Sequence, residues 1–359
     1  MPCRCCRAAS PTASRSRAWS APSRPPLTRL AVVAAKTTKK TARKKPARGA
    51  ATRTNPSRVS AASGNPAKVQ KATARDWIAG ARLRTLSLAI VPVALGTALA
   101  YVTLGYNLAL ALLCLAVAVF LQIGVNYAND YSDGVRGTDA LRVGPSRLTG
   151  SGAAKPRTVL TVALVFFGLA AAAGLAIVVL TGIWWLLAVG AVAIVAAWFY
   201  TGGKLPYGYL GLGELVAFLF FGLVATIGTV YVQIEQVPFE TWFAAALAGL
   251  FAAAIMLVNN IRDRELDARA GKKTFAVRVG DLPARIVFVV LLAGAYGAVV
   301  PFALLYTWAP AVFFTLLITA PVALIVLLAK TPGELVLALK LTSLAALLTG
   351  LGLAAAIAF

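Results

Sequence analysis

Residues 108–139 read LALALLCLAVAVFLQIGVNYANDYSDGVRGTD. The first two thirds of this stretch are apolar and long enough to cross the roughly 30 Å hydrocarbon layer of a bilayer as a helix. The stretch then changes character within one helical turn and ends in Asn126, Asn129, Asp130, Asp133 and Asp139. It therefore predicts a membrane-spanning helix with a cluster of oxygen-bearing side chains at one end.

A second stretch, VNNIRDRELD at 258–267, repeats this pattern at the end of another apolar run. Within each cluster the polar residues are spaced i,i+3 or i,i+4, so they share one face of a helix. Facing carboxylates repel one another unless cations lie between them, and oxygen ligands of this kind suit Mg²⁺, which substrate phosphates commonly complete. The alternative is that these acids pair with the neighbouring Arg and Lys, as at many helix ends.

Composition places most of the chain in a membrane. Of the 359 residues, 59% are hydrophobic and 13% charged, which leaves too little polar surface for a soluble globular protein. The absence of histidine excludes His-based general-base catalysis and His-ligated zinc. The four cysteines suggest no disulfide framework, since three lie among the first six residues.

The net charge of +23 is concentrated in the N-terminal part. Residues 1–75 hold 18 of the 35 Lys and Arg and none of the 12 Asp and Glu. This composition predicts a disordered basic extension over 1–75, which could be a transit peptide, a segment that binds anionic lipid, or a dispensable extension. Nucleic-acid binding has no support in the remaining domain, 76–359.

The fold predicted for residues 76–359 is an all-α integral membrane bundle of nine helices. The apolar runs are 83–104, 108–129, 157–180, 183–201, 210–233, 241–262, 284–306, 309–329 and 335–358. All Lys and Arg of the links fall on one side of the membrane if there are nine crossings. By the positive-inside rule, the N-terminus and the acidic clusters face the cytoplasm of a cell membrane and the C-terminus faces out.

The paired clusters resemble the two aspartate-rich motifs of the UbiA superfamily of intramembrane prenyltransferases. The resemblance extends from about Trp77 to the C-terminus, and the family's nine-helix plan has motifs after the second and sixth helices. It implies that Mg²⁺ ions bind the diphosphate of a prenyl donor, and it implies as metal ligands Asn129, Asp130, Asp133, Asp263 and Asp267. One position departs from the pattern: many members have a third aspartate where this chain has Gly137.

Three stretches, 129–149, 200–214 and 259–274, are similar to the group within that superfamily that prenylates 1,4-dihydroxy-2-naphthoate for menaquinone synthesis. The resemblance implies transfer from a polyprenyl diphosphate with loss of CO₂. As catalytic residues it implies Asp130, Asp133, Asp263, Asp267, Tyr200 and Lys204. Tyr200 and Lys204 are spaced i,i+4, a pattern also typical of interfacial anchoring. As substrate-binding residues it suggests Asn126, Arg136, Asp139, Arg142, Arg147, Asn259 and Lys272. The basic residues among them would bind either the diphosphate or the carboxylate of the acceptor.

Three alternatives remain at this point. Another aromatic acceptor, 4-hydroxybenzoate or homogentisate, would use the same motifs. A CDP-alcohol phosphotransferase is disfavoured because its aspartates lie in one contiguous stretch. A transporter is disfavoured because its carboxylates are expected near the bilayer midplane, whereas these acids lie at helix ends.

Overall fold

The first acidic cluster forms the end of one long helix, α3 (Leu108–Arg136), in the computed structural model. The structure describes residues 71–138, 147–204 and 206–359. The Asn107 side chain caps the helix by accepting the Leu110 N–H at 3.1 Å, and Gly137 ends it with a φ of 74°. The helix continues past the predicted end at residue 129, so the first acidic cluster stands on helical turns.

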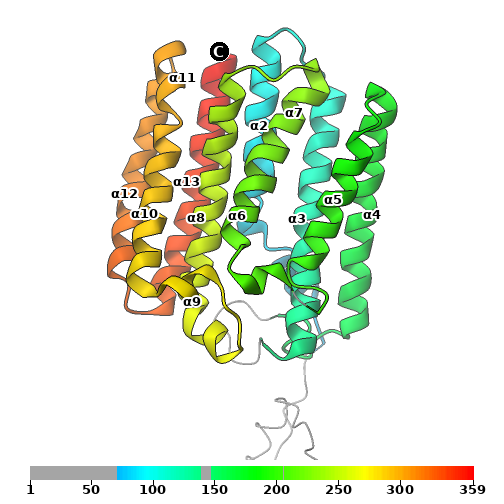
Figure 1. Ribbon diagram of the computed structural model, residues 1–359, viewed down its shortest axis with the longest axis vertical. Helices are drawn as coiled ribbons and strands as arrows, with labels where there is room; N and C mark the ends of the chain where they lie inside the picture. Colours follow the sequence, from blue (N-terminus) through cyan, green and yellow to red (C-terminus); the bar gives the residue numbers. More distant parts are fainter. Residues whose placement is uncertain (1–70, 139–146, 205) are drawn as a thin grey trace, which may run out of the picture. The chain divides into compact units, whose positions relative to one another are not determined.

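All nine predicted apolar runs are helical over most of their length (Figure 1). Helix α2 (Ser87–Val102) precedes α3. The long helices after α3 are α4 (Pro156–Thr181), α5 (Leu186–Phe199), α8 (Glu240–Arg269), α10 (Asp281–Gly297), α12 (Leu316–Leu328) and α13 (Pro332–Ala358). One further run is continuous but mixed, through α6 (Gly213–Ala217), the π-helical η4 (Phe218–Val224) and α7 (Ala225–Ile234). Short elements are α1 (Ala74–Gly80), η2 (Leu83–Thr85), η3 (Tyr207–Leu210), α9 (Phe275–Val279), α11 (Val300–Leu305) and η5 (Ala309–Thr315).

Fewer than nine of these helices are long and apolar enough to cross a membrane by length and composition alone. Among the described residues there are seven such helices, or eight if α1–η2 and α2 count as one span bent by 48°. The predicted run at 183–201 does not count as a candidate span, because its helix α5 is apolar but has only 14 residues. The reason is local, because the preceding Gly182 has a φ of 72° and ends α4, and α5 begins only at Leu186.

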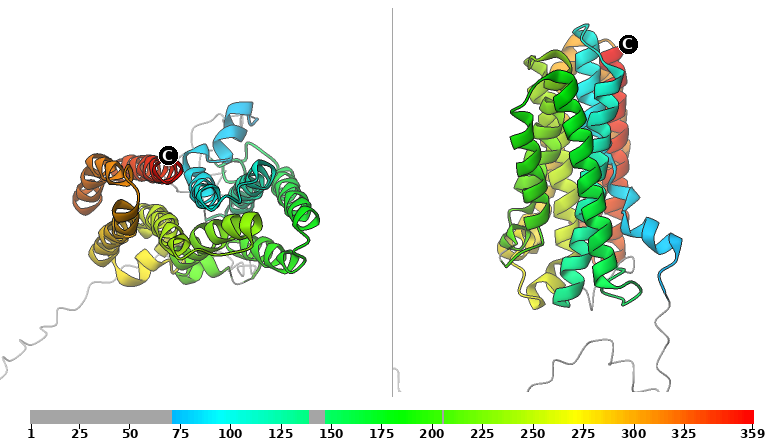
Figure 2. Two further views of the ribbon diagram at one scale, coloured as in Figure 1. Left: turned by 90° about the horizontal axis from the view of Figure 1, so that it is seen from above. Right: turned by 90° about the vertical axis from the view of Figure 1, so that its right-hand side faces the viewer.

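The helices pack into one bundle, seen end-on in Figure 2. Helix α3 runs along α4, α2 along α13, and α8 contacts α10, η4 and α13. Helix α8 is the most buried of the candidate spans, with 72% of its apolar window inside the protein. It approaches η4 closely because both carry glycine: a Cβ on Gly222 would lie 2.6 Å from the Gly249 Cα.

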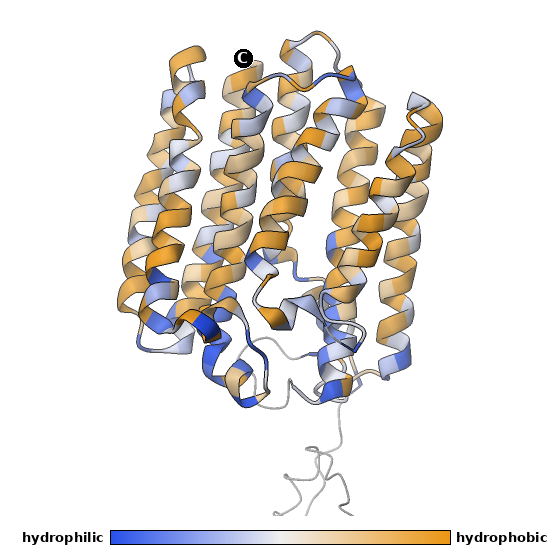
Figure 3. Cartoon of the chain, in the orientation of Figure 1, coloured by the Kyte–Doolittle hydropathy of each residue, from blue (hydrophilic) through white to orange (hydrophobic). Residues whose placement is uncertain are grey.

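Polar residues concentrate at one end of the bundle (Figure 3). The C-terminal ends of α3 and α8 and the short helix α9 lie at this end, whereas the C-terminus lies at the opposite end (Figure 1). The two acidic clusters therefore share one face of the bundle, as their positions after even-numbered runs predicted.

The predicted N-terminal extension lies almost wholly outside the described residues, which begin at Lys71. Its last residues belong to structure that the sequence analysis missed. Thr73 and Asp76 form a capping box, in which each side chain accepts from the other residue's backbone N–H, and this starts helix α1 at Ala74. Of the predicted site residues, Asp139 and Arg142 also lie outside the described part of the chain.

Candidate active site

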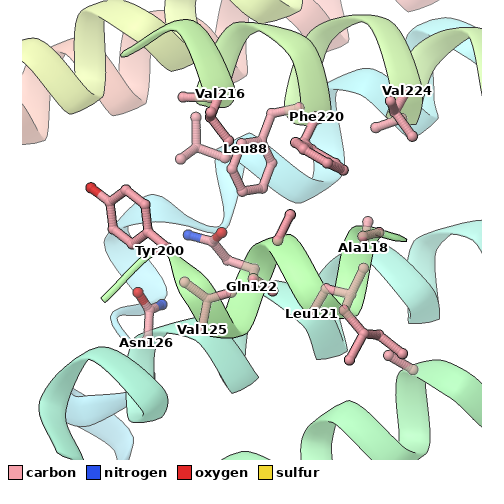
Figure 4. A pocket seen from close by; sticks show the side chains of 18 of the residues that line it. Leu88, Ala118, Leu121, Gln122, Val125, Asn126, Tyr200, Val216, Phe220 and Val224 are labelled. Carbon is pink, nitrogen blue, oxygen red and sulfur yellow. The ribbon is translucent and has the colours of Figure 1, made fainter. Parts of the chain in front are cut away.

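A pocket of about 540 Å³ opens between α2, α3, α4, α5, α7 and α8. Its wall is mostly apolar, and Figure 4 shows Leu121, Val125, Val216 and Phe220 around it, with Gln122, Asn126 and Tyr200 nearby. One end reaches Ile177 and Val232 near the far side of the bundle. Nine predicted site residues line it: Asn126, Asn129, Asp133, Arg147, Tyr200, Asn259, Asp263, Asp267 and Lys272.

Asp133 of α3 is a buried carboxylate of this pocket with two cationic neighbours. It is 3% exposed, and Lys272 Nζ lies 3.1 Å from its Oδ1 while Arg147 Nη1 lies 3.6 Å from its Oδ2. The Tyr209 hydroxyl also donates to Oδ1 at 2.5 Å. Two cations from separate segments therefore converge on one buried carboxylate.

Lys272 joins the two acidic clusters. The same Nζ that contacts Asp133 lies 3.9 Å from Oδ1 of Asp267, on α8. Asp263, one turn earlier on α8, is bound by Arg262 through two contacts of 2.7 and 2.6 Å. The tertiary structure thus brings residues some 130 positions apart in the chain around one positive charge.

Asp130 has different contacts from Asp133, although both belong to the first cluster. It is 2% exposed and does not line the pocket. Its two oxygens accept the backbone N–H groups of Leu148 and Thr149, each at 2.9 Å. It therefore fixes the segment that carries Arg147. Its neighbour Asn129 does face the pocket, with its Oδ1 accepting from the Thr201 hydroxyl at 2.6 Å.

Of the predicted site residues at the loop after α5, one lines the pocket and two do not. Tyr200 lines the pocket, and its hydroxyl contacts the Met256 sulfur at 3.1 Å. Lys204 is exposed and does not line the pocket. Arg136 is also outside the lining, because its guanidinium donates to the carbonyl oxygens of Thr201 and Gly203 and so ties the loop to α3.

Tyr209 is a pocket residue within the stretch 200–214, and it was not predicted as a site residue. Its ring lies under two cations, with Lys272 Nζ 4.5 Å and Arg136 Cζ 5.4 Å from the ring centroid. Burial, with the negative charge of Asp133, raises the pKa of the Tyr209 hydroxyl above its usual value, so it remains a donor to Asp133. Burial also raises the pKa of the nearby Tyr207 to about 12.

Three further polar residues of the wall were not predicted as site residues. Arg82, Gln122 and Asn260 all line the pocket. Asn260 donates to Glu214 at 2.8 Å, which links α8 to the start of α6. Gln122 lies within the apolar run of α3, where its side chain donates to the Thr85 hydroxyl at 3.3 Å.

The donor set fits a divalent magnesium site that a substrate completes. Among the described residues, no group of three or more Asp, Glu, Cys or His side chains is placed to hold a metal ion by itself. Where the two acidic clusters meet, the lining nevertheless offers side-chain oxygens from Asn129, Asp133, Asp263 and Asp267. Mg²⁺ usually takes one or two carboxylates and completes its shell with water and phosphate oxygens.

The family model described as "UbiA prenyltransferase family" matches residues 89–335. The chain is 47% identical over 292 residues to the 1,4-dihydroxy-2-naphthoate octaprenyltransferase of Mycobacterium tuberculosis, covering 80% of this chain and 98% of that one. Its fold is similar to that of a UbiA homolog from Aeropyrum pernix K1, with a TM-score of 0.58 at 18% identity over 74% of this chain and 96% of that one. It is also similar to a UbiA homolog from Archaeoglobus fulgidus bound to DMAPP and Mg²⁺, with a TM-score of 0.54 at 17% identity over 78% and 99% of the two chains.

Proposed function

The chain belongs to the UbiA prenyltransferase family, and on that basis we propose that it is a 1,4-dihydroxy-2-naphthoate polyprenyltransferase of menaquinone biosynthesis. It transfers a polyprenyl group from an allylic polyprenyl diphosphate to the naphthoate. The 47% identity to a relative of that name over 80% of this chain supports this acceptor over 4-hydroxybenzoate and homogentisate.

One observation carries the proposal at the level of geometry: Lys272 contacts carboxylates of both acidic clusters at the polar end of a long apolar pocket. A prenyl diphosphate has the same division, with a highly charged head and a hydrocarbon tail. The polar end suits the head and the apolar wall suits the tail. A transporter would instead need its carboxylates near mid-span.

We propose that Asn129, Asp133, Asp263 and Asp267 hold Mg²⁺ together with the diphosphate, as the magnesium-bound Archaeoglobus homolog suggests for the fold. When bound, Mg²⁺ would stabilise the negative charge that develops on the departing diphosphate. Lys272 and Arg147 add positive charge at the same place.

The reaction needs no oxidant and no added base. The C1–oxygen bond of the donor breaks, and its electron pair leaves with the diphosphate. The ring carbon that bears the carboxylate forms the new bond to C1. Loss of CO₂ then returns the electron pair of the broken carbon–carboxylate bond to the ring, which gives the demethylmenaquinone skeleton in its quinol form.

The protein contributes position and exclusion of water. An allylic cation would react with water, so the apolar wall, including Leu121, Val125 and Phe220, protects it. Asp130 and Arg136 act through other residues and do not contact the substrate. Asp130 orients the segment that carries Arg147, and Arg136 holds the loop after Tyr200. Most of the rate gain then comes from preorganised charge and from orientation.

We further propose that the chain crosses the cell membrane nine times, with α5 as the short crossing and the bent α1–η2 and α2 pair as another. By the positive-inside rule, the basic links support a cytoplasmic active-site face and a C-terminus on the outside. α5 runs beside the long helices in Figure 1, which supports counting it as a crossing.

The test is prenyl transfer by the full chain in liposomes with one prenyl diphosphate and Mg²⁺. The three acceptors, each labelled in its carboxyl group, are 1,4-dihydroxy-2-naphthoate, 4-hydroxybenzoate and homogentisate. We expect the naphthoate to be prenylated fastest, with release of one labelled CO₂ per product. Faster transfer to another acceptor, or retention of the label in the naphthoate product, would contradict the proposal.

A further inference from the structure

Arg82 has an unusual backbone conformation beside the pocket. It lies between α1 and η2 with φ 55° and ψ 53°, the left-handed region that is unfavourable for a residue with a bulky side chain. Two other non-glycine residues of the described chain have positive φ, Leu104 and Glu235, but neither lines the pocket. Backbone strain of this kind clusters at functional sites, so a strained residue in the pocket wall is a candidate for ligand binding.

Helix α3 fixes the backbone on both sides of Arg82. The Asn126 amide donates to the Ala81 carbonyl oxygen at 3.0 Å. The Gln122 amide donates to the Thr85 hydroxyl at 3.3 Å, and that hydroxyl donates to the Arg82 carbonyl oxygen at 3.0 Å. Asn126 and Gln122 are 4% and 5% exposed and line the same pocket, so this part of the wall is preorganised rather than adaptable.

The level of this anchor differs from that of the aspartates. Asn126 precedes Asp133 by seven residues on α3, so it lies about two turns, or roughly 10 Å, farther from the polar end. Of the cations that line the described pocket, Lys272 and Arg147 contact Asp133, at the proposed position of the diphosphate. Arg82 enters the wall from another segment, anchored at the deeper level of Asn126 and Gln122.

The proposed reaction needs a cation at such a place. The attacked carbon carries the carboxylate, so this group must come close to C1 of the donor while avoiding the diphosphate, which repels it. A guanidinium can bind a carboxylate through two parallel hydrogen bonds, which an ammonium cannot reproduce. Arg147 is already placed at the first acidic cluster.

We propose that Arg82 binds the carboxylate of the aromatic acceptor, an inference that rests on the proposed function. The bonds of Asn126 to Ala81 and of Gln122 to Thr85 hold the backbone of Arg82 in the pocket wall, at a deeper level than Asp133. Arg82 is thus a specificity-determining residue for acceptors that carry a carboxylate, and Arg147 serves the donor.

The test compares two ligands that differ only in the carboxylate, 1-hydroxy-2-naphthoate and 1-naphthol. Their Kd values are measured by calorimetry with the full chain in detergent, for wild type, Arg82→Gln and Arg82→Lys. Arg84→Gln is the matched control, because Arg84 lies two residues away, is exposed and does not line the pocket. Wild type and the Arg84 variant should bind the carboxylated ligand more tightly by about tenfold to a hundredfold.

We expect Arg82→Gln to remove this preference while the Kd of 1-naphthol stays the same, and Arg82→Lys to restore part of it. A general loss of packing would instead weaken both ligands. In turnover assays the variant should raise the KM for the naphthoate and leave the KM for the prenyl diphosphate unchanged. A retained preference in Arg82→Gln, or a rise confined to the KM of the prenyl diphosphate, would overturn the inference. Failure of wild type to prenylate the naphthoate would instead count against the proposed function.

Discussion

Asp130 and Asp133 lie three residues apart on α3, yet the structure gives them different partners. Asp133 faces two cations and a tyrosine in the pocket, whereas Asp130 accepts two backbone N–H groups of the following loop. The sequence motif suggests the same metal-binding role for both. Substitution of Asp133 should therefore affect mainly turnover, and substitution of Asp130 mainly stability.

Replacing Asp133 with Asn should reduce turnover by about a hundredfold or more, the scale seen when one electrostatic stabiliser of a developing charge is lost. The fold should persist, because the amide has the same shape. Turnover is measured across a MgCl₂ titration in liposomes. Asp281→Asn is the control, since Asp281 pairs with Arg285 outside the pocket. Equal activity of the two variants would contradict the role given to Asp133.

Replacing Asp130 with Ala should instead lower stability first. Two buried N–H groups, of Leu148 and Thr149, lose their charged acceptor, at a cost of about 2–5 kcal/mol. Thermal unfolding in detergent checks this, with Asp133→Asn as the comparison. If the melting temperature is unchanged and the Mg²⁺ dependence shifts as in the Asp133 variant, Asp130 is a metal ligand after all.

At the scale of elements, the apolar half of the pocket depends on small residues in α4, α5 and α7. Gly174, Gly190 and Gly228 line the pocket, and a Cβ added at each would meet no atom within 4 Å. This free space is available to a hydrocarbon chain. We therefore expect these helices, which the sequence marks only as apolar, to limit the length of the prenyl tail that fits.

Gly174→Leu should therefore lower kcat/KM for an octaprenyl donor much more than for a geranyl donor, by about tenfold or more in the ratio, because the added side chain fills the tail's path. Gly168→Leu is the matched control: it lies on the same helix, a Cβ there also meets open space, and it does not line the pocket. Competition between the two donors, read by mass spectrometry of the products, gives the ratio. An equal effect of both variants would mean that the tail follows another path.

At the scale of the whole molecule, hydrophilic residues concentrate at one end of the bundle (Figure 3), where α3 and α8 end with the two acidic clusters. The proposed topology makes that end cytoplasmic. The link between α7 and α8, which contains Phe239, should then face outward, since it carries no Lys or Arg.

Single cysteines test this arrangement in a background without the four native cysteines. Glu265→Cys, exposed near the end of α8, should react with an impermeant maleimide only when the reagent reaches the cytoplasmic side. Phe239→Cys, whose native side chain is 72% exposed, should react only from the opposite side. Labelling of both positions from one side would contradict the predicted crossings between them.

The sequence by itself determined the membrane class, the helical runs and the family. These follow from local properties: an apolar run of sufficient length has few alternatives to a helix in a bilayer, and the two acidic clusters are contiguous motifs. The positions of both clusters after even-numbered apolar runs also placed them at one face of the bundle. The capping box at Thr73 and Asp76 was an equally local signal that the analysis overlooked.

Only the tertiary structure decided which polar residues face the pocket. Helical spacing puts Asp130 and Asp133 on one side of α3, but the loop at Leu148 and Thr149 takes one carboxylate while Lys272 takes the other. Arg82 lies between the helices α1 and η2, and Tyr209 lies in the short helix η3; no period in the sequence marks either position as part of the site. The physical reason is that a buried charge is stabilised by whichever partners the packed helices bring to it, and those partners come from distant parts of the chain.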